Sequence, residues 1–106
     1  MLLSITVLHL MSFFSADLSA LDANYWIRQG DRAFNEQNIE ESITHYSRAI
    51  EDRPASVLGY LKRAKAYRAS GQFENYTNDV QKAMRLDPVY TKTYWEKSKN
   101  RSVIPK

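Results

Sequence analysis

The chain repeats itself with a period of 34 residues. Pro54 and Pro88 lie one period apart, and residues around them recur at the same spacing. The residues in register are Trp26, Tyr60 and Tyr94, then Gly30, Ala64 and Ser98, then Ala49 and Ala83. A fixed period of about 20 to 50 residues indicates a repeat protein, in which one unit cannot bury its apolar face alone. The sequence therefore predicts a stack of repeats, a design that usually provides a surface for holding a partner.

From about residue 20 onward, apolar residues follow the spacing of α-helices. A capping box at Ser19 and Asp22 predicts the first helix start, and Asn38 ends that run. Further helices are predicted at 39–50, 58–69, 73–86 and about 91–100, with Pro54 and Pro88 expected to stop the second helix of each pair. Only three glycines and three prolines are present, which also favours helices over turns.

No motif for catalysis or for a cofactor is visible. The chain has no cysteine, so thiolate metal sites and disulfides are excluded. His9 and His45 lack a spaced set of further ligands, and a Gly-rich phosphate loop and a nucleophile motif are missing. We therefore expect a non-enzymatic protein with neither metal nor cofactor.

The repeated residues resemble the tetratricopeptide repeat. In the first copy the resemblance lies in Gln29 to Phe34, Asn38 to Ile43, His45 to Ile50 and Pro54. In the second copy it lies in Tyr60, Ala64, Tyr67, Gly71, Phe73, Ala83 and Pro88. Two positions depart from the family pattern: Tyr76 stands in place of a small alanine and Val80 in place of an aromatic residue. We interpret this as a volume-conserving exchange, which leaves the fold prediction intact.

The resemblance implies an all-α fold, a short right-handed helical-repeat solenoid. Its domain spans residues 19–104, with helix pairs at about 23–56 and 57–90 and a capping helix at about 91–100. Two repeats are few, since about three are needed to bury a continuous core. The half repeat at 91–100 is expected to cover one end of the stack, because it combines an apolar and a polar face.

Residues 1–18 contain an apolar run of about thirteen residues, too short for a bilayer that needs roughly 20. The run is typical of a secretory signal peptide, yet no Lys or Arg precedes it and the nearest cleavage-like site is Leu18-Ser19-Ala20. Three interpretations stay open: a signal or membrane-association segment, an N-terminal helix that caps the stack, and a truncated or misassigned start. The match to the repeat is poor here, so a degenerate repeat is not expected.

Charge divides the chain into two halves. Residues 57–106 carry eleven Lys and Arg against four Asp and Glu, whereas residues 1–56 carry four against eight. By the resemblance, the first helix of each pair lines a concave groove. The residues assigned to this partner-binding groove are Ile27, Phe34, Leu61, Lys62, Lys65, Arg68, Lys92, Trp95 and Lys99, together with the acidic Asp31 and Glu96. Such a surface suits an extended peptide with acidic groups or a free C-terminal carboxylate.

The best-known groove of the resembled family grips the acidic C-terminal tails of Hsp70 and Hsp90. Its five places are usually Lys, Asn, Asn, Lys and Arg, and they are held here by Ile27, Asp31, Lys62, Lys92 and Glu96. Only Lys92 conforms. Because Asp31 and Glu96 would repel the tail's carboxylates, we do not expect chaperone-tail binding of the usual kind.

The favoured function is an adaptor that binds a protein or peptide, with a cytoplasmic location favoured. The alternative is a membrane-associated or secretory-pathway protein that displays its repeats from residues 1–18. Nucleic-acid binding is not favoured, because the basic and aromatic residues occupy repeat positions and no RNA-reading code is visible.

Overall fold

A computed structural model describes residues 24–101 of the chain. Residues 24–35 form a helix, followed by α2 (Ile39–Asp52), α3 (Val57–Ala69), α4 (Phe73–Leu86) and α5 (Pro88–Arg101). The range 24–101 contains no strand, which confirms the all-α fold. No helix within this range is both long enough and apolar enough to cross a membrane. The predictions for residues 1–18 and for the start of the first helix lie outside the described residues.

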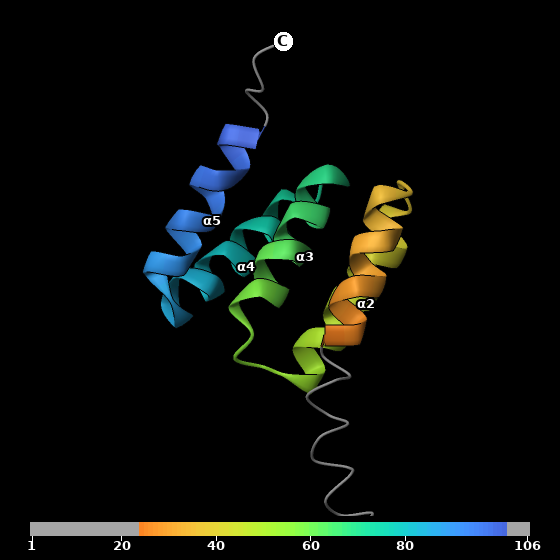
Figure 1. Ribbon diagram of the computed structural model, residues 1–106, viewed down its shortest axis with the longest axis horizontal. Coiled ribbons are helices and arrows are strands. Elements are labelled where there is room, and N and C mark those ends of the chain that lie inside the picture. The colour runs from red at the N-terminus through yellow and green to blue at the C-terminus, as the bar shows by residue number, and fades with distance from the viewer. Residues whose placement is uncertain (1–23, 102–106) are drawn as a thin grey trace, which may run out of the picture.

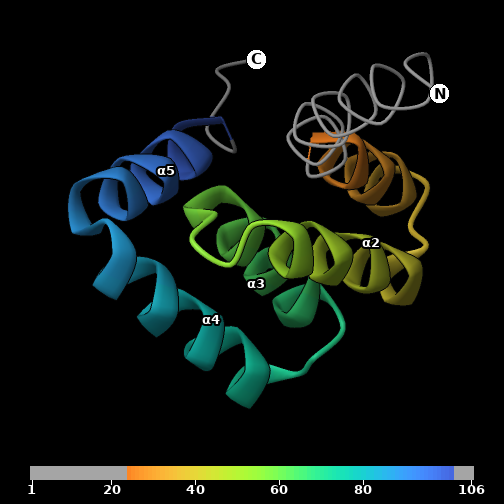
Figure 2. The ribbon, with the colours of Figure 1, turned by 90° about the horizontal axis from the view of Figure 1, so that it is seen from below.

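The helices are stacked in chain order (Figure 1). α3 packs between α2 and α4, and α5 packs against α4 and, less closely, α3. In Figure 2 the 24–35 helix, α3 and α5 follow an arc, with α4 on its outer side. This order is that of a helical-repeat solenoid, in which each helix pair contacts its neighbours in the sequence.

Within each helix pair, the same type of turn connects the C-terminus of the first helix to the second helix. Asn38 donates its amide hydrogen to Ala33 O at 2.8 Å and Gln37 donates to Phe34 O at 3.0 Å. One period later Gln72 and Gly71 make the same two bonds to α3. The turn needs a residue with positive φ, supplied by Gln37 at 66° and by Gly71 at 78°. The repeat is therefore reproduced at the level of single hydrogen bonds.

Close contact between the paired helices depends on small residues. Gly30 is buried against the ring of Tyr46, the residue that packs on it from α2. At the equivalent positions of the second pair, Ala64 is fully buried and Val80 is half-buried. The additional ring of the second pair, Tyr76, packs edge-on against Trp95 of α5, with 6.2 Å between ring centroids.

α5 begins at Pro88, three residues earlier than the predicted start at 91. Proline at the first helical position costs no hydrogen bond, and the preceding Asp87 caps the helix: its Oδ1 accepts from the Tyr90 amide at 2.9 Å. Pro88 thus starts a helix, whereas the sequence analysis assigned it only the role of stopping one. The link between α4 and α5 is Asp87 alone, against the four residues 53–56 between α2 and α3.

Candidate functional site

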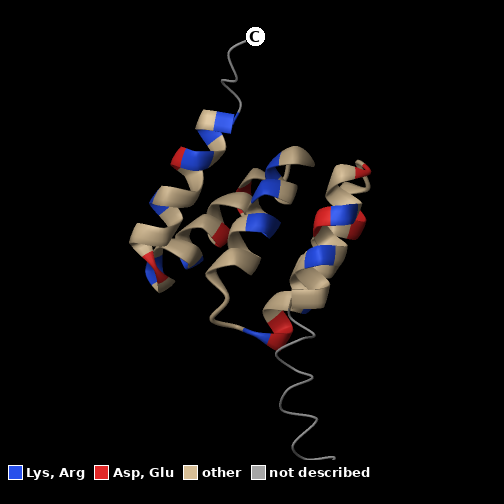
Figure 3. Ribbon diagram, in the orientation of Figure 1, with Lys and Arg blue, Asp and Glu red and all other residues tan. Residues whose placement is uncertain are grey.

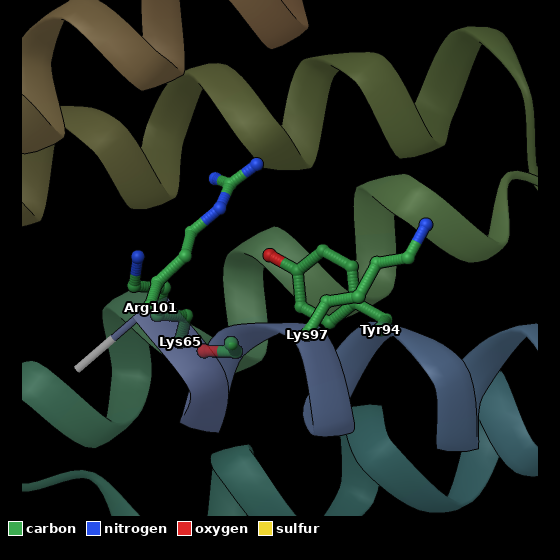
Figure 4. A pocket seen from close by; sticks show the side chains of 5 residues that line it. Lys65, Tyr94, Lys97 and Arg101 are labelled. Carbon is green, nitrogen blue, oxygen red and sulfur yellow. The ribbon is translucent and has the colours of Figure 1, made fainter. Parts of the chain in front are cut away.

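Two neighbouring cavities lie between the 24–35 helix, α3 and α5. The larger has a volume of about 490 Å³ and is lined by Lys65, Tyr94, Lys97, Ser98 and Arg101. The smaller, of about 210 Å³, is lined by Asp31, Phe34, Asn35, Tyr46, Lys62, Lys65, Tyr94 and Arg101. Because they share Lys65, Tyr94 and Arg101, we treat them as one site and call it the basic groove. Figure 4 shows Tyr94, Lys97 and Arg101 projecting from α5 on the side where Lys65 of α3 lies.

The one carboxylate among these lining residues is held by the protein itself. Lys62 Nζ donates to both oxygens of Asp31, at 2.7 and 2.8 Å, and Tyr46 donates its hydroxyl hydrogen to Asp31 Oδ1 at 2.6 Å. Burial, supported by this bond and by the charge of Asp31, raises the pKa of Tyr46. Tyr46 therefore stays protonated and keeps donating, so the charge of Asp31 is matched by Lys62.

The remaining cations of the groove come from α3 and α5. Lys65 Nζ stands 4.9 Å from the centroid of the Phe34 ring, a cation–π contact that keeps the ammonium over the groove floor. Within residues 24–101, no carboxylate lies within ion-pairing distance of Lys65, Lys97 or Arg101. Burial and the negative charge of Asp31 raise the pKa of Tyr94, which is therefore neutral at physiological pH. Basic residues also predominate along α3 and α5 in Figure 3.

The structure brings some of the residues assigned to the groove together and separates others. Phe34, Lys62 and Lys65 line it, as does Asp31. Leu61 is fully buried, which corrects its assignment: it belongs to the core and offers no surface to a partner. Ile27 is half-buried and Arg68 is exposed, and neither lines the two cavities.

The assignments on α5 need a larger correction. Lys92, Trp95 and Lys99 line a different cavity, together with Glu96, Met84, Pro88 and Val89. At 100° per residue, these positions face away from those of Tyr94, Lys97 and Arg101 on the same helix. The structure therefore places the assigned α5 residues on the side of the helix that faces away from the basic groove.

Sequence reasoning missed Tyr94, Lys97 and Arg101 as groove residues, although their i, i+3, i+7 spacing marks one helix face. It also missed a buried ion pair behind the groove. Arg63 donates to Asp79 from Nε at 2.7 Å and from Nη2 at 2.8 Å, and from Nη1 to Ser47 Oγ at 3.1 Å. In the first repeat, Gln29 and His45 stand at the positions of Arg63 and Asp79, so the period gave no signal for this pair.

Within the described residues, no cluster of three or more His, Cys, Asp or Glu residues is arranged to hold a metal ion. His45 is engaged otherwise: its ring stacks on Trp26 with 5.5 Å between centroids, and its Nε2 lies 3.4 Å from Glu41 Oε1. The arrangement of the groove supports recognition of an anion through cations and aromatic rings.

Comparison with known proteins places the repeat. The family model described as TPR repeat matches residues 30–71, the stretch that contains the turn after the 24–35 helix and the Gly30–Tyr46 contact, and that ends at Gly71 in the turn after α3. The chain contains a tetratricopeptide repeat. Its matched part starts in the helix before α2 and ends in the turn after α3.

The chain is similar to segments of much longer proteins. It is 38% identical over 69 residues to "Hsp70-Hsp90 organizing protein 3" of Arabidopsis thaliana, covering 65% of this chain and 12% of that protein. It is 33% identical over 66 residues to the "Heat-shock protein cognate (HSC) co-chaperone sgt12" of Aspergillus fumigatus, covering 62% and 19%. It is 33% identical over 67 residues to the "E3 ubiquitin-protein ligase TTC3" of Mus musculus, covering 63% and 3%. The chain thus spans less than a fifth of the length of these relatives.

Proposed function

We propose that this tetratricopeptide repeat protein is a non-enzymatic interaction module that holds an acidic segment of a partner protein in the basic groove. The repeat family supports a role in protein–protein interaction, and the relatives include proteins named as co-chaperones and as an organizing protein for Hsp70 and Hsp90. Those names describe the relatives. For this chain, the proposal rests on the charges of the groove.

One observation carries the proposal: the carboxylate of the groove is already matched, while three of its cations are not. Asp31 is bound by Lys62 and Tyr46, which leaves Lys65, Lys97 and Arg101 to face the cavities. Cations held around a partly desolvated cavity favour carboxylate groups of a ligand. The Phe34 and Tyr94 rings provide apolar contact for the ligand's backbone and methylene groups.

The electrostatic argument against a chaperone tail changes with the structure. Asp31 is matched by Lys62, and Glu96 lies on the other side of α5, so neither presents an unmatched negative charge to a ligand in the groove. However, Lys92, which alone conforms to the usual clamp, also lies outside the groove. We therefore infer that acidic ligands are bound by Lys65, Lys97 and Arg101, in a pattern that differs from the five-residue clamp.

The test is a fluorescence-anisotropy titration with a short fluorescein-labelled peptide rich in glutamate. Its matched control is the same peptide with glutamine, and both are prepared with free and with amidated C-termini. We expect the glutamate peptide to bind and the glutamine peptide to bind at least about tenfold more weakly. The amidated pair measures separately what the C-terminal carboxylate contributes.

Variants locate the binding. Lys65→Glu and Arg101→Glu are each expected to lower the affinity for the glutamate peptide by about tenfold, because each replaces a cation of the groove by an anion. Arg85→Glu is the matched control, since Arg85 is exposed on α4 and lines neither cavity of the groove. Equal affinity for both peptides, or equal losses in all three variants, would contradict the proposal.

A further inference from the structure

The cavity that Lys92, Trp95 and Lys99 of α5 line is separate from the basic groove. It has a volume of about 520 Å³ and lies between the end of α4 and the first three turns of α5. We call it the α4–α5 cleft; it is lined by Met84, Pro88, Val89, Lys92, Trp95, Glu96 and Lys99. Its lining is mainly apolar, and two of the apolar lining residues are exposed to solvent: Val89 is 74% and Met84 45% accessible.

No helix of the described part of the chain covers this cleft. α4 packs on α3, and α5 turns Thr91 toward the stack, where this residue is buried. The side of α5 that carries Lys92 and Glu96 faces outward, away from the basic groove. In a helical-repeat stack, each apolar outer face is normally covered by the next element. The α4–α5 cleft is thus an apolar helix–helix surface that lacks its covering element within residues 24–101.

The shape of the cleft suits an α-helix. Pro88, Lys92, Trp95 and Lys99 follow one another at spacings of four, three and four residues, so they form a straight strip along α5. Trp95 forms the floor where it packs edge-on against Tyr76 of α4. A strip of this kind, with Met84 on the facing helix, matches the groove into which an amphipathic helix lays its apolar side.

Charge indicates which kind of helix fits. The lining residues include two lysines, Lys92 and Lys99, and one carboxylate, Glu96. A second copy of this chain docked by the same surface would bring its own lysines to this positive rim, and like charges at an interface are unfavourable. A helix with acidic residues beside its apolar stripe would instead be attracted to the rim.

We propose that the α4–α5 cleft is a second docking surface, which takes an amphipathic helix of another protein with acidic residues flanking its apolar stripe. This proposal is independent of the proposed function, because the α4–α5 cleft lies on the side of α5 opposite the basic groove. The module would thereby hold an extended acidic segment on one side of α5 and a helix on the other.

The probes are two synthetic helical peptides of about 15 residues, the length at which isolated helices begin to be stable in water. Both carry leucines at i, i+3, i+4 and i+7 spacing, and the stripe is flanked by glutamates in one peptide and by lysines in the other. The reporter is Trp95, which becomes the only tryptophan of the chain in a Trp26→Phe variant. We expect the glutamate-flanked peptide to change the Trp95 emission at saturable concentrations and to bind about tenfold more tightly than the lysine-flanked peptide.

Three variants in the Trp26→Phe background test the location. Val89→Ser is expected to lower the affinity for the glutamate-flanked peptide several-fold, and the variant should fold normally because Val89 is largely exposed. Lys92→Glu with Lys99→Glu should reverse the preference between the two peptides. Lys97→Glu, which changes the basic groove, should leave the helix affinity unchanged, so that a failure here is distinguishable from a failure of the groove. Absence of an emission change, or affinities that ignore Val89→Ser and the charge reversal, would overturn the proposal.

Discussion

Gly30 lies against the ring of Tyr46, so closely that a Cβ at position 30 would overlap the ring carbons and stand 2.9 Å from Cζ. The second repeat solves the same packing problem with the opposite distribution of volume, because Ala64 and Val80 occupy the equivalent positions. In each pair, the residue on the first helix and the residue that faces it from the second helix together determine how closely the two helices approach.

Replacing Gly30 by alanine should lower the free energy of unfolding by about 1–3 kcal/mol, because the added methyl group overpacks the contact with Tyr46. In a Tyr46→Val background, the same replacement should cost nothing or add about 0.5–1 kcal/mol, the usual gain of alanine over glycine in a helix. The double-mutant cycle is measured by urea unfolding. An equal cost in both backgrounds would show that the two side chains are not coupled.

Gln37→Gly should stabilise the protein by about 0.5–1 kcal/mol. Gln37 has φ of 66°, a conformation in which a side chain is unfavourable, and Gly71 occupies the same place in the next repeat. The reciprocal control, Gly71→Ala, should destabilise by about 1 kcal/mol, since its φ is 78°. Thermal unfolding of both variants checks the pair, and a Gln37→Gly protein that melts lower than the wild type would speak against this turn geometry.

Asp79→Ala should cost about 3–5 kcal/mol, because it leaves the partly buried Arg63 guanidinium without its carboxylate. Replacing both partners by apolar residues, Arg63→Met with Asp79→Leu, should cost much less, since no buried charge is left unpaired. Urea unfolding monitored by circular dichroism gives both values. If the single and double variants were equally unstable, the loss would come from packing alone.

Stability should fall at alkaline pH. Burial and Asp31 raise the pKa of Tyr46, whereas an unfolded tyrosine titrates near 10. The folded state therefore holds the proton more tightly, and its advantage is complete below about pH 10 and is lost as pH rises further. Urea unfolding between about pH 8 and pH 11 measures this decline. Tyr46→Phe should make it shallower, and an identical slope in the variant would rule out this cause.

Much of the fold could be predicted from the period alone. The close contacts at Gly30 and Ala64 follow from small residues recurring in register, and the turns at Gln37 and Gly71 recur with the same bonds. These features repeat because the same two-helix unit is built twice. The period carried no information on Arg63 and Asp79, since their counterparts one repeat earlier are Gln29 and His45.

The candidate site was predicted less well. Lys92, Trp95 and Lys99 were assigned to the groove, whereas in the structure Lys97 lines the groove and the three assigned residues line the α4–α5 cleft. The period matches positions between helices, but it does not fix which side of the last helix faces the groove.

The central claim is that the basic groove binds an acidic segment. Charge reversal at Lys97 and at Lys92 tests it most directly, because the two residues lie on the same helix and line different cavities. The measurement is the affinity of the glutamate-rich peptide for Lys97→Glu and Lys92→Glu, at the same low ionic strength. We predict that Lys97→Glu weakens binding by about tenfold and that Lys92→Glu changes it by less than about twofold. Loss of binding in Lys92→Glu with retention in Lys97→Glu would contradict the account.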